Sequence, residues 1–399
     1  MKYMGSKRSM LQNGLGELIC DRAQYARRIV DLFCGGGAVA WFAAENTARP
    51  VLAVDLQTYA VVLARAVIGR NIPLDPNQLV VKWLNQVKHG RVRSLWWGSA
   101  VSLEKDAKDT RELVEGARTL CERPSAIGPI WNAYGGHYFS PTQTLAFDYM
   151  LKYLPQDEPE RSVCLAATIS AASKCAAAPG HTAQPFQPTE TAGRFLREAW
   201  RRDPLSICES ALFEICPRHA KTIGEACTSN ALDVVSRLRS DDLVVVDPPY
   251  SGVQYSRFYH VLETIARGWC SPVGGVGRYP PITERPQSDF SNKSQSRLAL
   301  EKLLKALATV ETTVVFTFPS EECSNGLSGE IVVETASVWF DVEERLINGK
   351  FSTLGGNNTR RASRKSSSEL LLLMQPKKRH HLNPVRESER GDSQHVPSW

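Results

Sequence analysis

The stretch Leu243-Val-Val-Val-Asp-Pro-Pro-Tyr250 indicates the fold of this chain more clearly than any other segment. Four apolar residues, three of them β-branched valines, are typical of a strand buried on both faces in the middle of a parallel sheet. The strand is expected to end at Pro248 and Pro249, because proline cannot donate ladder hydrogen bonds and keeps the preceding residue extended. A carboxylate, two rigid prolines and an aromatic ring therefore lie at the carboxyl edge of a sheet, where open α/β sheets bind ligands.

This edge predicts methyl transfer to an exocyclic amine. The carboxylate of Asp247 can accept one hydrogen bond from an NH2 group, and the carbonyl of Pro248, freed from the ladder, can accept the other. The ring of Tyr250 can stack on the base that carries the amine. Two acceptors turn the nitrogen lone pair toward an incoming methyl group. We therefore predict Asp247, Pro248, Pro249 and Tyr250 as catalytic residues.

Two earlier strands predict a cradle for a cofactor. The segment Arg28-Ile-Val-Asp-Leu-Phe-Cys-Gly-Gly-Gly37 passes from a short apolar strand into a glycine turn, and a helix is expected over 38–45. Glycines at such a turn let a ligand approach the backbone at a helix N-terminus. The next strand, Val51-Leu-Ala-Val-Asp55, ends in a carboxylate 24 positions after Asp31 (55 − 31). That spacing is close to the roughly 20-residue offset of an acid that binds a ribose.

The parallel-sheet pattern stops after a helix expected over 59–68 and resumes near residue 221. An interruption of this length is typical of an inserted lobe, which commonly holds substrate. Four parts are therefore expected: a cofactor half over 1–71, an inserted lobe over 72–220, a catalytic half over 221–375 and a disordered basic tail over 376–399.

The fold class that follows is α/β: a doubly wound, Rossmann-like sheet with an antiparallel C-terminal hairpin and a mostly helical inserted lobe. Residues 272–296 are rich in Gly, Pro, Ser and charge, which predicts a mobile flap beside the site. The other expected elements are helices over 10–19, 142–154 and 298–310, and strands over 312–318, 338–343 and 369–374.

Composition excludes several classes of protein. The formal net charge of +6 over 399 residues permits nucleic-acid binding without requiring it. The ten cysteines are scattered singly, with no Cys-x-x-Cys pair and no Cys/His cluster at zinc spacing, so we expect buried thiols in a reducing compartment and no metal site. No apolar run reaches membrane-spanning length and the N-terminus lacks the apolar core of a signal peptide, so a cytoplasmic protein with no membrane partner is expected.

Three motifs in one order resemble those of a known family. They are Lys2-Tyr-Met-Gly-Ser-Lys7, Asp31-x-Phe-x-Gly-x-Gly37 and, after the long insertion, Asp247-Pro-Pro-Tyr250. Their order resembles that of the alpha-group, Dam-like adenine-N6 DNA methyltransferases, in which the target-recognition domain lies between the cofactor half and the catalytic strand. The resemblance spans residues 1 to about 375, although the insertion shares only its position and general character.

The resemblance implies S-adenosyl-L-methionine as cofactor and a flipped-out adenine in duplex DNA as substrate. The residue that contacts the cofactor adenine matches either Asn230 or Asp233, and an Asn there departs from the usual Asp. In relatives, the lysine at the position of Lys7 can also approach the DNA. The other cofactor-binding residues that the resemblance implies are Tyr3, Gly5, Lys7, Asp31, Phe33, Gly35, Gly37 and Asp55.

Double-stranded DNA is the expected partner, and a cognate restriction or defence nuclease is considered as a second one. Basic and aromatic residues in the insertion and in the loop over 349–368 suit phosphate contact and base stacking. For each of them the alternative is a solvated charge or a core aromatic. The DNA-binding residues predicted are Lys7, Arg91, Arg93, Tyr255, Arg360, Arg361, Arg364 and Lys365. Contact with DNA implies association with the nucleoid.

Three alternative interpretations are weaker. Cytosine-N4 methylation uses a similar apparatus, usually with Ser where Asp247 stands, so Asp247 favours adenine. Cytosine-C5 methylation needs a cysteine directly after a proline, and none of the ten cysteines has that neighbour. A DNA-binding module with a decayed methylase core is the third alternative, and the intact glycines, Asp55 and Asp247 argue against it.

The basic loop allows a test that needs only the sequence. Replacing Arg360 and Arg361 with alanine should weaken binding to every DNA sequence and lower the salt dependence by about one unit of slope for each phosphate that the loop no longer neutralises. Binding isotherms at several salt concentrations measure both quantities. If affinity and slope stayed as in the wild type, the loop would have to be assigned to structure.

Overall fold

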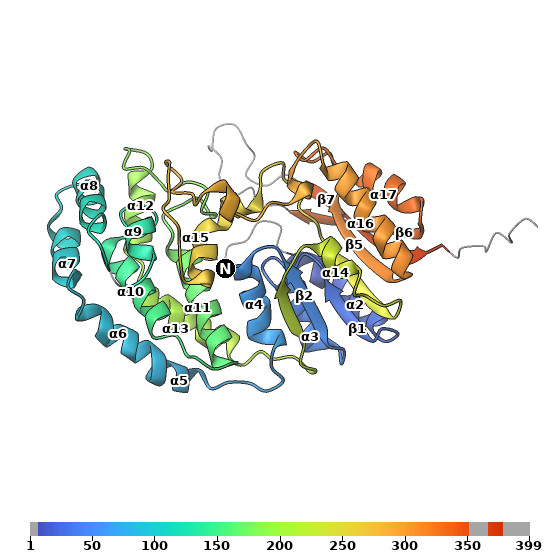
Figure 1. Ribbon diagram of the computed structural model, residues 1–399, viewed down its shortest axis with the longest axis horizontal. Helices are drawn as coiled ribbons and strands as arrows, with labels where there is room; N and C mark the ends of the chain where they lie inside the picture. Colours follow the sequence, from blue (N-terminus) through green and yellow to red (C-terminus); the bar gives the residue numbers. More distant parts are fainter. Residues whose placement is uncertain (1–6, 126, 351–365, 378–399) are drawn as a thin grey trace, which may run out of the picture.

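The computed structural model describes residues 7–125, 127–350 and 366–377. A seven-stranded sheet in the order β3-β2-β1-β4-β5-β7-β6 forms the right-hand half of the molecule in Figure 1. Neighbouring strands from β3 to β5 are parallel, whereas β7 is antiparallel to both β5 and β6. The strands are β1 (Arg28–Asp31), β2 (Val51–Asp55), β3 (Glu225–Thr228), β4 (Asp242–Val246), β5 (Thr313–Pro319), β6 (Phe340–Lys350) and β7 (Ser366–Pro376).

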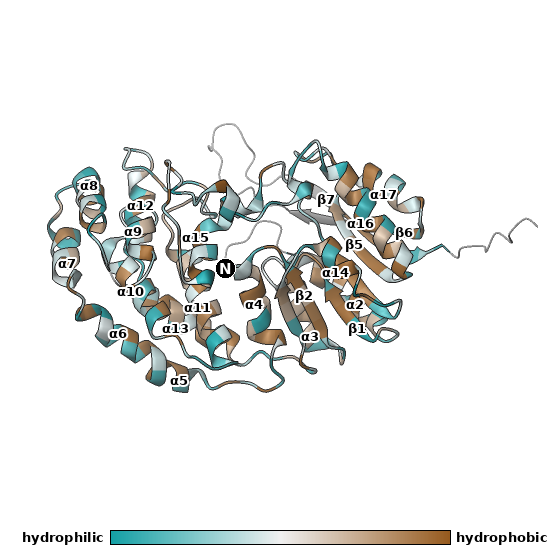
Figure 2. Ribbon diagram, in the orientation of Figure 1, coloured by the Kyte–Doolittle hydropathy of each residue, from teal (hydrophilic) through white to brown (hydrophobic). Residues whose placement is uncertain are grey.

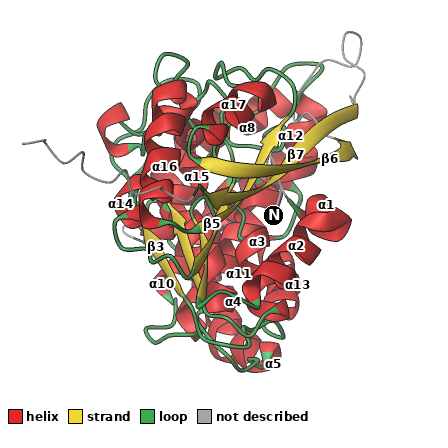
Figure 3. Cartoon of the chain, turned by 90° about the vertical axis from the view of Figure 1, so that its right-hand side faces the viewer, coloured by secondary structure: helices red, strands yellow, loops and turns green. Residues whose placement is uncertain are grey.

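The central strand β4 is buried along its whole length, as its apolar run predicts. Because side chains alternate along a strand, Leu243 and Val245 pack on one face and Val244 and Val246 on the other. Helices cover both faces, as the side view in Figure 3 shows. The first face carries α2 (Gly16–Ala23), α3 (Ala38–Asn46) and α4 (Thr58–Ile68), and the second carries α14 (Ala231–Val235), α16 (Ser296–Val310) and α17 (Gly329–Ser337).

The predicted fold class, including the antiparallel C-terminal hairpin, is confirmed. Three elements differ from expectation. The edge strand β3 was not predicted, because Glu225-Ala-Cys-Thr228 is short and has only one buried residue. The helix expected over 10–19 is interrupted at Asn13 and Gly14, where Gly14 has a φ of +107°. The strand expected over 338–343 begins at Phe340, since α17 continues to Ser337.

The inserted segment forms a helical lobe, on the left in Figure 1. Figure 2 shows mainly hydrophobic strands in the sheet and lobe helices with both hydrophobic and hydrophilic sides. None of the described helices has the length and apolar composition needed to cross a bilayer. The lobe helices are α5 (Pro76–Leu79), α6 (Asn85–Val92), α7 (Trp97–Asp106), α8 (Thr110–Cys121), α9 (Ile130–Tyr134), α10 (Pro141–Lys152), α11 (Glu160–Cys175), α12 (Gly193–Trp200) and α13 (Pro204–Ile215).

The lobe and the sheet share one hydrophobic core, because α11 packs against α4 and the same buried cluster continues into α10 and α13. The helix α15 (Tyr255–Arg267), which follows β4, also packs on the lobe. The hydroxyls of Tyr134 and Thr264 lie 2.9 Å apart, and Thr182 donates its backbone N–H to the carbonyl of Phe258 at 2.7 Å. The boundary expected at residue 220 follows the order of elements along the chain. The helix α15 lies beyond that boundary in the sequence, but in space it packs on the inserted lobe.

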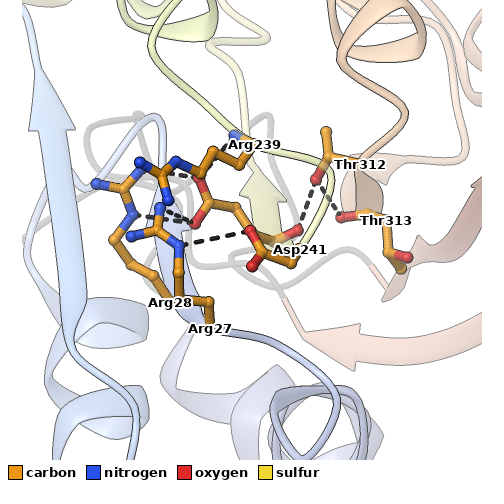
Figure 4. A network of polar contacts seen from close by, with 7 residues as sticks. Arg27, Arg28, Arg239, Asp241, Thr312 and Thr313 are labelled. Carbon is orange, nitrogen blue, oxygen red and sulfur yellow. Dashed lines mark hydrogen bonds and ion pairs between the residues drawn. The ribbon is translucent and has the colours of Figure 1, made fainter.

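The amino ends of β1 and β4 are joined by a buried ion network (Figure 4). The side chain of Asp242 is fully buried and accepts hydrogen bonds from Arg28 at 2.7 and 3.1 Å, from Arg27 at 3.0 Å and from the backbone N–H of Arg239 at 3.1 Å. The hydroxyl of Thr312 donates to the carbonyl of Asp242 at 2.6 Å, which ties the start of β5 to the same point. A buried carboxylate is tolerated here because several charged and backbone donors satisfy it.

Replacing Asp242 with alanine should lower the free energy of unfolding by about 1–3 kcal/mol, because Arg28 and the backbone N–H of Arg239 lose their acceptor and Arg27 loses one of its two partners. The neighbouring Asp241 provides a matched control. Its side chain is 55% exposed and lies 3.4 Å from Arg27, so Asp241→Ala should cost less than about 1 kcal/mol. Urea unfolding of both variants measures the difference, and equal losses would contradict the importance of the buried network.

Candidate active site at the carboxyl edge of the sheet

A cavity opens at the carboxyl ends of β1, β2 and β4, the edge that the sequence predicts. Its empty volume is about 1410 Å³, including the open mouth. The chain leaves β1 toward β2 and β3 on one side of the sheet, and enters β4 and β5 on the other. Ligand crevices form at such a reversal of strand order. The cavity is also lined by the start of α14, by α16 and by the segment 286–290.

The glycine turn after β1 is held to the end of β2 by Asp55. The N–H of Gly35 donates to Oδ2 of Asp55 at 2.9 Å, and the N–H of Gln57 donates to Oδ1 at 2.9 Å. Gly35 has a φ of +46°, a conformation that favours glycine. Burial raises the pKa of Asp55 to about 6, against the lowering effect of these two backbone donors. Asp55 therefore shapes the cradle in addition to lining it.

The carboxylate of Asp31 borders the cavity with an unsatisfied oxygen. Its side chain is buried, and Oδ2 has no hydrogen-bond partner among the described residues. Burial, with the nearby charge of Asp247, raises the pKa of Asp31 to about 8, and the backbone N–H of Phe33 opposes this shift. A buried acceptor without a donor is costly, and a cationic amine in the cavity would satisfy it.

The carboxylate of Asp247 is held from one side. Nζ of Lys7 lies 3.0 Å from Oδ1, and the hydroxyl of Thr317 on β5 donates to the same oxygen at 2.9 Å. Burial raises the pKa of Asp247, while Lys7 and the Thr317 hydroxyl lower it. Lys7 is itself 4% exposed and lies 3.0 Å from Oε2 of Glu369 on β7. Within the described part of the chain, Oδ2 of Asp247 accepts no hydrogen bond and stays available to a ligand.

The loop after β4 is clamped by a residue far along the chain. The fully buried Asn325 donates through Nδ2 to the carbonyls of Pro249 at 3.1 Å and Phe290 at 3.0 Å. Gln254 binds the backbone N–H and carbonyl of Ser288 at 2.8 and 2.9 Å. These contacts secure the segment 286–290 over the cavity. The neighbouring carbonyl of Pro248 accepts no hydrogen bond from any described residue.

Aromatic rings line the cavity on two sides. The side chains of Tyr250 and Tyr255 are hydrogen-bonded to each other, and burial raises the pKa of Tyr250 above its ordinary value. Nζ of Lys7 lies 5.9 Å from the centroid of the Tyr250 ring. On the other side, the rings of Phe33 and Phe290 meet edge to face with centroids 5.5 Å apart. Flat apolar surfaces of this kind suit planar ligands.

Most of the described residues predicted for the site come together here. Asp233 lies in the first turn of α14 and is absent from the lining, whereas Asn230, the residue that caps α14, belongs to it. Gly37 caps α3 with a φ of +77° and is likewise absent, while Gly36 lines the cavity. The predicted residues in the lining are Lys7, Asp31, Phe33, Gly35, Asp55, Asn230, Asp247, Pro248, Pro249, Tyr250 and Tyr255.

The structure shows the surroundings of three residues predicted to bind DNA, and their contact with DNA stays a prediction. Lys7 is buried between two carboxylates, and Tyr255 lies inside the cavity, so neither faces outward. Arg91 lies 3.7 Å from Asp203 and 5.1 Å from the ring of Trp97, which assigns it to the packing of the lobe. Arg93 is exposed. The predicted residues Tyr3, Gly5, Arg360, Arg361, Arg364 and Lys365, and the basic tail from 378, lie outside the described residues.

Sequence reasoning missed Glu369, Thr317, Asn325 and Gln254 as members of the site. A signal existed for two of them, because Thr317 stands between two phenylalanines and Glu369 directly precedes an apolar run. For Asn325 and Gln254 the loops around them carry no such pattern. The described residues contain no group of three or more His, Cys, Asp or Glu side chains that could hold a metal ion.

Comparison with known proteins agrees with this geometry. Residues 3–91 match the D12 class N6 adenine-specific DNA methyltransferase family. The family resemblance of the three motifs is therefore confirmed over the cofactor half, where Asp31, Gly35 and Asp55 lie. Strand order and the hairpin agree with a Rossmann-like methyltransferase fold over the rest of the chain.

Two curated relatives have similar segments. Modification methylase LlaI of Lactococcus lactis subsp. lactis is 37% identical over 83 residues, which is 20% of this chain and 13% of that protein. Modification methylase StsI of Streptococcus sanguinis is 26% identical over 133 residues, 33% of this chain and 19% of that protein. The similarity thus covers less than a fifth of the length of each relative. A family of this kind implies a methyl donor.

The unsatisfied carboxylate of Asp31 makes stability depend on pH. A carboxyl whose pKa is raised in the folded state stabilises the fold below its unfolded pKa near 4 and loses that contribution as pH rises toward 8. Asp31→Asn should therefore stabilise the ligand-free protein at pH 8 by an amount on the order of a few kcal/mol, since each unit corresponds to about 1.4 kcal/mol. Urea unfolding between pH 5 and pH 9 measures the slope.

Asp289 is a suitable control for this experiment, because it lines the same cavity but is exposed. Asp289→Asn should leave the pH dependence of the unfolding midpoint close to that of the wild type. A midpoint for Asp31→Asn that falls below the wild type at pH 8 would show that Asp31 has a stabilising partner.

Proposed function

We propose that this chain transfers a methyl group from S-adenosyl-L-methionine to the N6 amine of an adenine flipped out of duplex DNA. The observation that carries the proposal is the state of Asp247. Two donors hold Oδ1, while Oδ2 and the neighbouring carbonyl of Pro248 are left as acceptors at a cavity edge. Two acceptors side by side fit the two hydrogens of an exocyclic amine.

The cavity contains groups that fit the proposed cofactor. Oδ2 of Asp31 lacks a donor and suits the ammonium of the methionine part. Asp55 uses one lone pair on each oxygen for a backbone N–H and keeps acceptor capacity for ribose hydroxyls. Asn230 and the Phe33–Phe290 wall suit the adenine part. When it is bound there, S-adenosyl-L-methionine supplies an electrophilic methyl group.

The residues after β4 orient the nucleophile. Oδ2 of Asp247 and the carbonyl of Pro248 accept the two N–H bonds of the amine and direct the nitrogen lone pair away from the ring plane. Tyr250 supplies a stacking surface that offsets part of the few kcal/mol needed to remove a base from the duplex. The segment 286–290, held by Asn325 and Gln254, excludes water from one side of the cavity. Catalysis then rests on positioning and electrostatics.

DNA is proposed as the partner from the match to the family and the names of the two relatives. The exposed Arg257 follows Tyr255 and Ser256 of the cavity lining and stacks 5.3 Å from the ring of Tyr279. It is therefore well placed to contact a phosphate near the flipped base. The inserted lobe, with Arg93, is proposed as the target-recognition part. A cognate nuclease and a cytoplasmic, nucleoid-associated location belong to the same proposal.

Asp247→Ala should abolish most turnover while cofactor binding is less affected. Losing one preorganised group of this kind costs roughly 3–4 kcal/mol, or a hundred- to a thousand-fold in rate. The measurement is nucleoside analysis of DNA incubated with enzyme and S-adenosyl-L-methionine, together with calorimetry of cofactor binding. Methyl groups on cytosine N4 would change the base and leave the mechanism standing. Methyl groups on no amine, with cofactor bound, would favour a DNA-binding module with an inactive core.

Tyr250 provides the matched pair for this test. Tyr250→Ala removes the stacking surface, worth about 1–3 kcal/mol, whereas Tyr250→Phe keeps the ring and loses the hydroxyl that is hydrogen-bonded to Tyr255. Tyr250→Phe should therefore retain much of the activity that Tyr250→Ala loses. Equal losses in the two variants would assign the role to the hydroxyl.

A further inference from the structure

Glu369 is a buried carboxylate directly before the apolar run of β7. It begins the run Glu369-Leu-Leu-Leu-Leu-Met374 of β7 and pairs across the sheet with Pro319 of β5 and Ile347 of β6. Glu369 is 6% exposed, and burial raises the pKa of its carboxyl. Burying a carboxylate in the interior of a sheet is costly unless a cation satisfies it. The cation is Lys7, whose Nζ lies 3.0 Å from Oε2.

Lys7 stands between two carboxylates, Glu369 on β7 and Asp247 at the end of β4, at 3.0 Å from each. Burial alone would lower the pKa of Lys7, but the two carboxylates outweigh it and the pKa lies well above its ordinary value. The lysine is therefore charged, and its charge is shared. If the only role of Lys7 were to neutralise Asp247, a second buried carboxylate at the same distance would be an unnecessary cost.

The shared contact has a geometric consequence for Asp247. A lysine free to move could place its ammonium between both oxygens of that carboxylate. Glu369 holds the ammonium on the side of Oδ1, where Thr317 also donates. We propose that Glu369 is a positioning residue that acts through Lys7 to keep Oδ2 of Asp247 open to the amine and to limit how far Lys7 reduces the basicity of that carboxylate. This inference deepens the proposed function and rests on it.

Other charged or titratable groups also face Asp247 and contribute to its pKa. The carboxyl of Asp31 on β1 repels it, and the two tyrosines of the cavity lie beside it. Among the described residues, the groups that interact electrostatically with Asp247 include Lys7, Asp31, Tyr250, Tyr255 and Glu369. A test must therefore replace one of these residues at a time and compare the direction in which the pKa of Asp247 shifts.

The pKa of Asp247 should shift in opposite directions when Glu369 and when Lys7 is replaced. Neutralising Glu369 leaves the whole charge of Lys7 to Asp247, so the pKa of Asp247 should fall. Removing Lys7 leaves the carboxylates without their cation, so the pKa of Asp247 should rise. If Glu369 and Lys7 served folding alone, both variants would lose stability, and the pKa of Asp247 would not shift in opposite directions in the two variants.

The experiment is the pH dependence of kcat/KM for DNA methylation by the full chain. In Glu369→Gln, which keeps an acceptor for Lys7 and removes the charge, the acid limb should move down by roughly half a unit to one unit. In Lys7→Met it should move up by about 1–3 units, as expected when a carboxylate loses an adjacent cation. Glu343→Gln, at an exposed position of β6 in the same hairpin, should leave the acid limb in place.

A second measurement does not depend on catalysis. Urea midpoints are compared at pH 7, without DNA or cofactor, for Lys7→Met, Glu369→Gln and the double variant. The double variant should lose less than the sum of the single losses, whereas Lys7→Met combined with Glu343→Gln should be additive.

Additive losses for Lys7 and Glu369, or an acid limb that Glu369→Gln leaves in place, would overturn the inference. A wild-type chain that methylates no DNA at any pH would instead fail the proposed function. The unfolding cycle would then still decide whether Glu369 and Lys7 interact, so the two failures are distinguishable.

Discussion

Burial of β4 on both faces is the constraint on which the rest of this structure depends. All five residues of Asp242–Val246 are buried, between β1 and β5 and between two layers of helices. The buried Asp242 at one end aligns β4 with β1 through two arginines. Two prolines at the other end stop the ladder. A strand restrained at its start and ended abruptly presents Asp247 at a defined depth in the sheet edge.

The described part of the site holds more buried carboxyl groups than Lys7 can pair with. Asp31, Asp55, Asp247 and Glu369 have raised pKa values because they are buried, and Lys7 is the cation that contacts two of them. Such an arrangement is costly in the ligand-free protein and becomes favourable when a cationic ligand enters. The electrostatic cost of the site is therefore consistent with a cofactor that carries positive charge.

The fold places parts that are distant in sequence around one cavity. Lys7 contacts Asp247 and Asn325 contacts Pro249, although they lie far apart in the sequence. Glu369 of the late strand β7 contacts Lys7. The lobe is joined to the sheet through the shared core of α4 and α11, and to the cavity through α15, whose first residues line it. The lobe and the cavity at the sheet edge are thus connected through α15.

The sequence by itself determined the strands β1, β2, β4 and β5, the glycine turn, the hairpin and the cavity residues that follow β1, β2 and β4, because these depend on local patterns. Buried valine runs, glycines before a helix and prolines after a strand act within a few residues, so they are visible without the fold. The short edge strand β3 and the break in the first helix were not predicted, since their residues carry weak patterns.

Only the tertiary structure decided how the charges are partnered. Local sequence places Lys7 in a polar, basic terminus, which favours an exposed cation, yet two carboxylates 240 and 362 positions away (247 − 7 and 369 − 7) bury it. That Asn230 lines the cavity and Asp233 does not depends likewise on where α14 begins. Ion pairing and cavity lining depend on distances between elements, and those distances are set by packing across the whole sheet, which no local pattern encodes.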